Sequence, residues 1–169
     1  MTKNHFLSLY QYNTWANNTI LNHLKQLPEG IIRSQVKSVF PSIFDILMHV
    51  YIIDQGWYSV LTKAYRSDDY QTIKTTVDRL VSEVKDLGLE DFTKKQQNLA
   101  INLETFIPGN DMGYMDTFSG VQMTYGDVVT HMVNHGTYHR GNVTAMLHQL
   151  GEKGVPTDYG VYLYYTSRQ

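Results

Sequence analysis

Three histidines spaced four residues apart are the feature of this sequence best suited to chemistry. The segment "THMVNHGTYHRGN", residues 130–142, contains His131, His135 and His139. In an α-helix a four-residue step rises ~6 Å and turns ~400°, so adjacent histidines project from nearly the same face. Two adjacent imidazoles can therefore bind one metal ion, whereas His131 and His139, ~12 Å apart along the axis, cannot. The spacing predicts a site made of one adjacent pair and a further ligand from elsewhere.

His49 is the best candidate for that further ligand. It is the only other histidine in a strongly apolar segment, where an unpaired imidazole would cost about 1 kcal/mol or more. The alternative is a core histidine whose ring bonds to a backbone carbonyl. Three neutral imidazoles leave a coordination position open for water or a substrate atom, and nitrogen ligands suit Zn²⁺, Ni²⁺ or a similar ion. Such a site would favour ionisation of a bound water or thiol.

The composition restricts the classes of function. The 169 residues include no cysteine and carry a net charge of −2. Without cysteine there are no disulfides, thiolate metal sites or cysteine nucleophiles, and a small negative charge offers no face for nucleic acid. No run of eighteen apolar residues and no signal-peptide pattern occurs. We therefore expect a single domain, residues 1–169, that is cytoplasmic and has no nucleic-acid or membrane partner.

Several known site types are excluded by their missing motifs. The strings "HMVNH" and "HGTYH" lack the glutamate with which H-E-x-x-H zinc proteases activate water. Di-iron carboxylate bundles need Glu-x-x-His pairs, and no glutamate here precedes a histidine by three residues. The glycine-rich motifs of dinucleotide sites and P-loops and the Gly-x-Ser-x-Gly motif of serine hydrolases are also absent from the sequence.

The elements that must position the histidines are predicted to be helices. Apolar residues recur at three- and four-residue steps over four segments, 3–27, 41–66, 69–89 and 124–150. Ser42 with Asp45, and Thr124 with Asp127, resemble capping boxes at the starts of the second and fourth helices. Gly151 is typical of the residue that follows a helix C-terminus.

Residues 93–123 are predicted to form a long connection with a β-hairpin. They contain Pro108 and several glycines, and the run Leu99, Ile101, Leu103 alternates in the manner of a strand. The predicted fold class is therefore all-α: a four-helix bundle with a long connection between its third and fourth helices.

Three segments together resemble the DinB family of bacterial metal-dependent four-helix-bundle proteins. They are "YNTWANN" at 12–18, "DILMHV" at 45–50 and "TYGDVVTHMVNHGTYHRGN" at 124–142, and the resemblance covers nearly the whole chain. The family is related to low-molecular-weight-thiol transferases and to a thiol-dependent maleylpyruvate isomerase. Its name records induction by DNA damage and implies no DNA polymerase activity.

The resemblance implies a particular ligand set. In the family the metal is held by a histidine of the second helix and by two histidines of an Asn-His-x-x-x-His-Arg-Gly-Gln-like stretch. These map onto His49, His135 and His139, which leaves His131 as a neighbour of the site. The sequence departs from the pattern at Asn142, where the family usually has glutamine.

Asn13, Asn17 and Arg140 are candidate catalytic residues, because their polar side chains are expected near the ligands. The alternatives are helix-surface polarity for the two asparagines and a structural ion pair for Arg140.

The sequence leaves more than one function open. The leading hypothesis is a metal-dependent thiol transferase or hydrolase acting on a small molecule such as a low-molecular-weight thiol. One alternative is a non-catalytic, metal-binding stress-response module in which the ion is structural, and another is a bundle whose histidines are merely packed. The tail "VPTDYGVYLYYTSRQ" is too apolar to be left in water, so it should pack on the bundle or on a second subunit. With the habit of the family, this predicts a homodimer.

Overall fold

The protein is mostly helical, in broad agreement with the predicted all-α class. A computed structural model describes residues 3–28, 30–64, 70–118 and 120–168. In chain order its elements are α1 (Lys3–Leu24), the short 3-10 helix η1 (Ile31–Arg33), α2 (Ile43–Leu61), α3 (Tyr70–Val84), α4 (Leu89–Gly109), β1 (Met115–Phe118), β2 (Val121–Thr124), α5 (Tyr125–Gln149) and α6 (Tyr159–Thr166).

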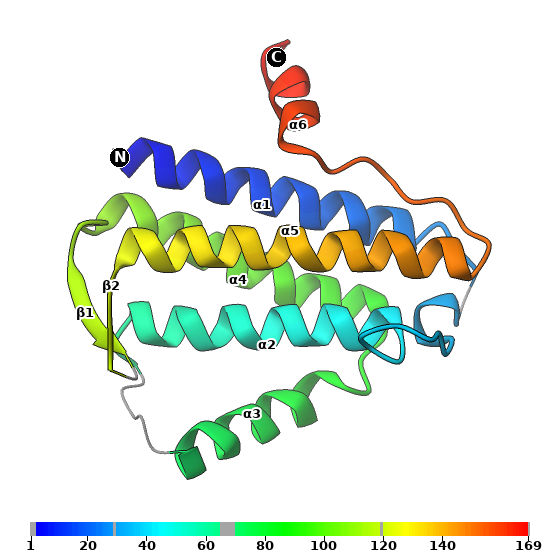
Figure 1. Cartoon of the computed structure of the whole chain (residues 1–169), viewed down its shortest axis with the longest axis horizontal. Helices are drawn as coiled ribbons and strands as arrows, with labels where there is room; N and C mark the ends of the chain where they lie inside the picture. Colours follow the sequence, from blue (N-terminus) through cyan, green and yellow to red (C-terminus); the bar gives the residue numbers. More distant parts are fainter. Residues whose placement is uncertain (1–2, 29, 65–69, 119, 169) are drawn as a thin grey trace.

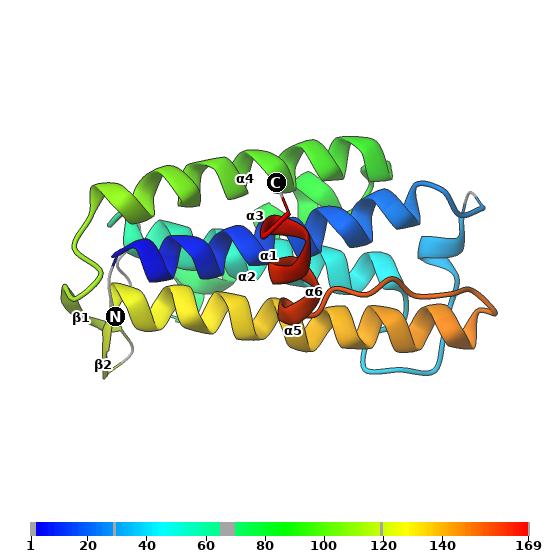
Figure 2. The ribbon, with the colours of Figure 1, turned by 90° about the horizontal axis from the view of Figure 1, so that it is seen from above.

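Four long helices, α1, α2, α4 and α5, lie side by side (Figures 1 and 2). α1 packs against α4 and α5, and α2 packs against α5 and runs in the opposite direction. α3 slants away from this group and contacts it through α2 (Figure 1). The pair α2 and α5, which carries the candidate ligands, is thus held in place by neighbours on both sides.

The helix α4 was not predicted, and the sequence interpretation of 93–123 as a long connection is wrong over most of its length. The buried residues of α4 include Phe92, Gln96, Leu99 and Leu103, which follow helical steps. Polar Gln96 interrupts the apolar pattern, and Ile101, which is 61% exposed, created the alternation that resembled a strand. The predicted count of four helices is therefore corrected to six α-helices in the described part of the chain.

The predicted β-hairpin is confirmed at the end of that segment. β1 and β2 pair antiparallel, with Met115 opposite Thr124 and Phe118 opposite Val121. The hairpin leads directly into α5, so it sets the point at which the histidine-bearing helix begins.

The starts of α2 and α5 are capped as predicted. The Ser42 hydroxyl accepts from the backbone N–H of Asp45 at 3.3 Å, and Thr124 with Asp127 forms a complete capping box. At the end of α5, Gly151 has φ +81°, a left-handed conformation that favours glycine.

Several predicted helix boundaries differ from the structure or lie beyond what it describes. The first helix ends at Leu24 rather than at residue 27, and the third ends at Val84 rather than at residue 89. The second helix ends at Leu61, earlier than the predicted residue 66. Residues 65 and 66, and the predicted start of the third helix at 69, lie outside the described residues.

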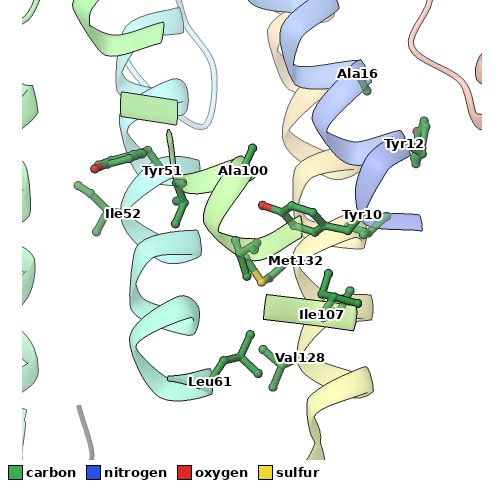
Figure 3. Close-up of a cluster of buried hydrophobic side chains, with 14 of the residues drawn as sticks. Tyr10, Tyr12, Ala16, Tyr51, Ile52, Leu61, Ala100, Ile107, Val128 and Met132 are labelled. Atoms are coloured by element: carbon green, nitrogen blue, oxygen red, sulfur yellow. The ribbon is translucent and has the colours of Figure 1, made fainter. Parts of the chain in front are cut away.

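Apolar side chains from the side-by-side helices form the core. Figure 3 shows part of it, with Leu61 of α2 and Val128 of α5 pointing toward one another. A second cluster joins Ile43 and Ile46 of α2 to Met146 of α5. Each large apolar side chain buried in this way stabilises the fold by ~1.5–3 kcal/mol. The two clusters hold α2 against α5 near both ends of their contact.

The apolar tail packs on the helical body only in part. The rings of Tyr159 and Tyr162 lie 5.0 Å and 5.7 Å from the ring of Tyr12, which confirms that the tail contacts the body. Further along α6, Leu163 and Tyr164 remain exposed. None of the helices in the described ranges is both long enough and apolar enough to span a membrane.

Candidate metal centre

Histidines from two helices converge on one point. His135 Nε2 lies 3.2 Å from His49 Nε2 and 3.1 Å from His139 Nε2. Two nitrogen ligands of a tetrahedral ion are ~3.3 Å apart when each metal–nitrogen bond is 2.0–2.1 Å. The structure therefore brings together the three residues that the sequence predicted as ligands, at separations that suit one ion.

Hydrogen bonds among the rings satisfy these nitrogens poorly. A neutral imidazole has one N–H and one lone pair, so the Nε2 atom of His135 cannot hold a proton and also accept from both neighbours. The Nδ1 atoms of His135 and His139 are buried without a hydrogen-bond partner among the described residues. Three converging nitrogen lone pairs fit a divalent transition metal, and this donor set accepts several such ions, Zn²⁺ and Ni²⁺ among them.

The environment keeps the three rings neutral. Burial lowers the pKa of His49, and burial together with nearby His49 lowers the pKa of His139. Burial, with the charges that His139, His49 and His131 would carry, lowers the pKa of His135 to about 4. Because metals bind the neutral form of imidazole, little free energy is needed to deprotonate these ligands at neutral pH.

Two aromatic side chains flank the histidines. The ring of Phe40, just before α2, lies 4.9 Å from the ring of His49 and 5.7 Å from that of His139. Tyr138 is 62% exposed and its ring lies 4.9 Å from that of His139. Sequence reasoning missed Phe40, because it lies outside a helix and has no periodic pattern to mark it.

His131 lies beside the cluster rather than in it. Its ring stacks on that of His135 at 5.7 Å and meets the ring of Trp57 edge-on at 5.3 Å. His131 is exposed, whereas His139 is buried. These contacts agree with the expectation that His131 is a neighbour of the site.

The three candidate catalytic residues form a separate cluster between α1 and α5. Nη1 of Arg140 donates to Oδ1 of Asn13 at 2.7 Å and to Oδ1 of Asn17 at 2.8 Å. Nη2 donates to Oγ1 of Thr137 at 2.8 Å. Arg140 and Asn13 are buried, so these residues are brought together mainly with one another.

A small cavity connects the two clusters. It has a volume of about 30 Å³ and is lined mainly by apolar side chains such as Ile20, Leu47 and Val50, with His139 and Arg140 in its wall. Because an ordered water needs two to four polar partners, this apolar lining favours a dry cavity.

Two further residues near the site escaped sequence reasoning. Asp54 is completely buried in α2, neither of its carboxylate oxygens has a hydrogen-bond partner in the described chain, and burial raises its pKa to about 8 against the opposing charge of Arg140. A Cβ on Gly136 would lie 2.6 Å from Oδ1 of Asn13 and 2.8 Å from Nη1 of Arg140. The sequence offered a signal for each residue. Asp54 is a charged residue on an apolar helix face, and Gly136 is a glycine inside a helix.

The chain is a mostly helical protein with a candidate metal centre. Histidine nitrogens from the antiparallel helices α2 and α5 converge at this centre. The model of the DinB family matches residues 1–169, and the chain therefore belongs to the DinB family. Protein DinB of Bacillus subtilis (strain 168) is 41% identical over 169 residues, which covers 95% of each chain. The family resemblance found in the sequence is confirmed.

Proposed function

We propose that the protein binds a divalent transition metal, Zn²⁺ or Ni²⁺, through His49, His135 and His139 and uses it in thiol transfer or hydrolysis. The supporting observation is the convergence of three imidazole nitrogens, with 3.1 Å and 3.2 Å between neighbours. In this proposal α1, α2, α4 and α5 act as a four-helix bundle around the site. When bound, the ion would supply Lewis acidity that lowers the pKa of a thiol or water at its open position.

The proposed reactions need the residues of the chain to orient the reactants. In thiol transfer the thiol loses its proton, its sulfur bonds to an electrophilic carbon, and the leaving group departs with the bonding electron pair and takes up a proton. In hydrolysis water replaces the thiol. Exposed Tyr138 and the ring of Phe40 would contact the reactants, because both flank the histidines. The substrate would be a small molecule such as a low-molecular-weight thiol.

A structural role for the ion is the second candidate function. Its support is that His139 is only 6% exposed and that Phe40 covers part of the cluster. In this case the protein would be a metal-binding stress-response module, and the ion would only join α2 to α5.

Metal analysis tests the site itself. We expect about one ion per chain in the purified protein and almost none in the His135→Ala, His139→Ala variant, since one ligand cannot hold the ion. His148→Ala is the matched control, because His148 is an exposed histidine of the same helix. Equal, near-zero metal content in the wild type and the double variant would refute the site.

Cobalt substitution separates catalysis from a structural role. If the site is open, adding a thiol to the Co²⁺-loaded protein should produce a sulfur-to-cobalt charge-transfer band, and chelation should destabilise the fold modestly. A structural ion predicts no such band and a large loss of thermal stability on chelation. A broad screen of thiol-accepting and hydrolysable compounds that found no turnover by metal-replete protein would contradict the enzyme proposal.

We further propose that the protein acts in the cytoplasm as a homodimer. The support for a dimer is the exposed apolar surface of α6, where Leu163, Tyr164 and Tyr165 are 47%, 52% and 56% exposed. Sedimentation at micromolar concentration should give the mass of two chains, and a monomeric mass would contradict the dimer.

A further inference from the structure

An apolar pocket lies between α2 and α3. Its volume is about 210 Å³, and its lining includes Ile53, Gly56, Val60, Ile73, Val77 and Phe118. None of the lining residues in the described part of the chain is ionisable. The pocket exists because α3 slants away from α2 (Figure 1) and buries only Leu80 and Val84 of its own residues.

Gly56 keeps the pocket open. A Cβ at this position would meet nothing within 4 Å, and the residue does not have a positive φ. A glycine inside a helix costs ~1 kcal/mol relative to alanine. Neither backbone conformation nor close packing requires glycine here, so α2 loses stability at the place where a side chain would fill the pocket.

The pocket lies about one to three helical turns along α2 from His49. Ile53, Gly56 and Val60 follow His49 by four, seven and eleven residues, so all four lie on one face of α2. Gly56 is ~10 Å from His49 along the helix axis. Trp57, which also lines the pocket, has its ring 5.3 Å from that of His131.

We propose that this pocket binds the apolar group of the small molecule whose reacting end binds at the three histidines. The inference rests on the proposed function and names part of its substrate. A cavity of ~150 Å³ accommodates benzene, so this pocket has room for a substituted aromatic ring or a short branched alkyl chain. Without a counter-charge the pocket would reject an ionised group. In thiol transfer it would therefore hold the compound that receives the thiol, rather than a charged thiol itself.

The first experiment tests whether the pocket accepts an apolar ring. The chain has two tryptophans, so Trp15→Phe leaves Trp57 as the only one. In this background, titration with toluene should change the emission of Trp57. Gly56→Leu fills the pocket and should abolish the change, whereas Gly160→Leu, at another position with nothing within 4 Å, should not. If toluene leaves the Trp57 emission of the Trp15→Phe protein unchanged, the inference is overturned.

The second experiment tests whether the pocket and the histidines serve one ligand. The Co²⁺-loaded protein is titrated with ethanethiol and with phenylalkanethiols of increasing chain length. We expect the best phenylalkanethiol to bind at least ~10-fold tighter than ethanethiol, since burying a ring contributes a few kcal/mol. Gly56→Leu should remove this gain without changing the metal content or the affinity for ethanethiol.

The outcomes distinguish this inference from the proposed function. Ethanethiol binding without any gain from the ring, or a gain that survives Gly56→Leu, overturns the inference and leaves the proposed function standing. A missing cobalt–thiolate band for every thiol contradicts the proposed function itself. If Gly56→Leu dissociates a dimer, the pocket belongs to a second copy of the chain and the inference is wrong. Should Gly56→Leu fail to fold, Ile73→Phe narrows the pocket from α3 without adding a tryptophan and must give the same results.

Discussion

His139 and Arg140 are consecutive residues of α5, yet they belong to two regions with opposite organisation. His139 faces α2, where its ring lies 4.8 Å from the ring of His49. Arg140 faces α1, where its guanidinium donates to Asn13 and Asn17. In the histidine region the Nε2 atoms contact mainly each other, whereas most of the guanidinium donors have oxygen partners from the chain.

The difference distinguishes the histidine region, a candidate ligand site, from the Arg140 cluster, whose hydrogen bonds stabilise the fold. Nitrogen lone pairs that converge at 3.1 Å and 3.2 Å favour a cation that the chain does not supply. The terminal nitrogens of the Arg140 guanidinium donate to amide and hydroxyl oxygens of the chain, although its Nε has no partner among the described residues, and these bonds stabilise the fold. Arg140 shares the lining of one small cavity with His139, but its hydrogen bonds go to Asn13, Asn17 and Thr137.

The largest expected loss of stability comes from Arg140→Ala. The change leaves the buried Oδ1 atom of Asn13 and that of Asn17 without a donor, so we expect a loss of ~3–5 kcal/mol in the free energy of unfolding. His135→Ala in metal-free protein should cost less than ~1 kcal/mol, because it removes a ring with an unpaired Nδ1 atom. Urea unfolding of both variants measures the contrast, and a larger loss for His135→Ala would reverse the comparison.

Asp54, whose carboxyl interacts with the charge of Arg140, and His135 should make the free energy of unfolding depend on pH in opposite directions. Burial raises the pKa of Asp54 to about 8, so the folded protein keeps a proton that the unfolded chain releases near pH 4. Stability falls as the pH rises through this window. Burial and the neighbouring histidines lower the pKa of His135 to about 4, so the unfolded chain takes up a proton below about pH 6.5 that the folded protein refuses. Protonation of His135 in the unfolded chain therefore lowers the stability of the folded protein as the pH falls from 6.5 to 4.

The variant Asp54→Asn isolates the contribution of Asp54 to the pH dependence of stability. With about 1.4 kcal/mol for each unit of pKa difference, the variant should gain roughly 5 kcal/mol relative to wild type at pH 8 and little at pH 4. The measurement is the urea midpoint of metal-free protein at several pH values. A gain that is constant with pH would show that Asp54 is ionised in the folded protein, contrary to the expectation.

A smaller effect is expected from Gly136→Ala. The added Cβ would lie 2.6 Å from Oδ1 of Asn13, so the asparagine and Arg140 must shift, at a cost of ~1–2 kcal/mol. Gly141→Ala is the matched control on the same helix, where nothing lies within 4 Å of the added atom. That control should gain up to ~1 kcal/mol from helix propensity. Equal thermal shifts for the two variants would show that the arginine cluster adapts freely.

The smallest effect is expected from His131→Ala. His131 stacks on His135 without joining the three converging nitrogens, so metal affinity should change by less than ~3-fold. His135→Ala should lower it by ~100-fold or more. Competition with a chromophoric chelator measures both affinities. A tenfold loss in His131→Ala would place His131 among the groups that orient the ligands.

Local signals in the sequence were sufficient for much of the fold and for part of the site. The caps at Ser42 and Thr124 and the stop at Gly151 were correctly predicted, because capping depends on residues a few positions apart. The helix α4 was missed because buried Gln96 and exposed Ile101 disturb its pattern, and their burial depends on neighbouring helices.

The sequence by itself determined that the histidines of α5 lie on one helix face and that His131 and His139 cannot bind the same ion, because helical rise and turn are local properties. The apolar segment around His49 also indicated His49 as their partner, and the family resemblance selected His135 and His139 as the adjacent pair. Only the tertiary structure decided that α2 presents His49 to His135 and that Arg140 turns toward α1. Those contacts join residues 86 and 127 positions apart in the chain, and they depend on how whole helices pack. The pocket at Gly56 likewise exists only because α3 packs at a slant, which no local pattern encodes.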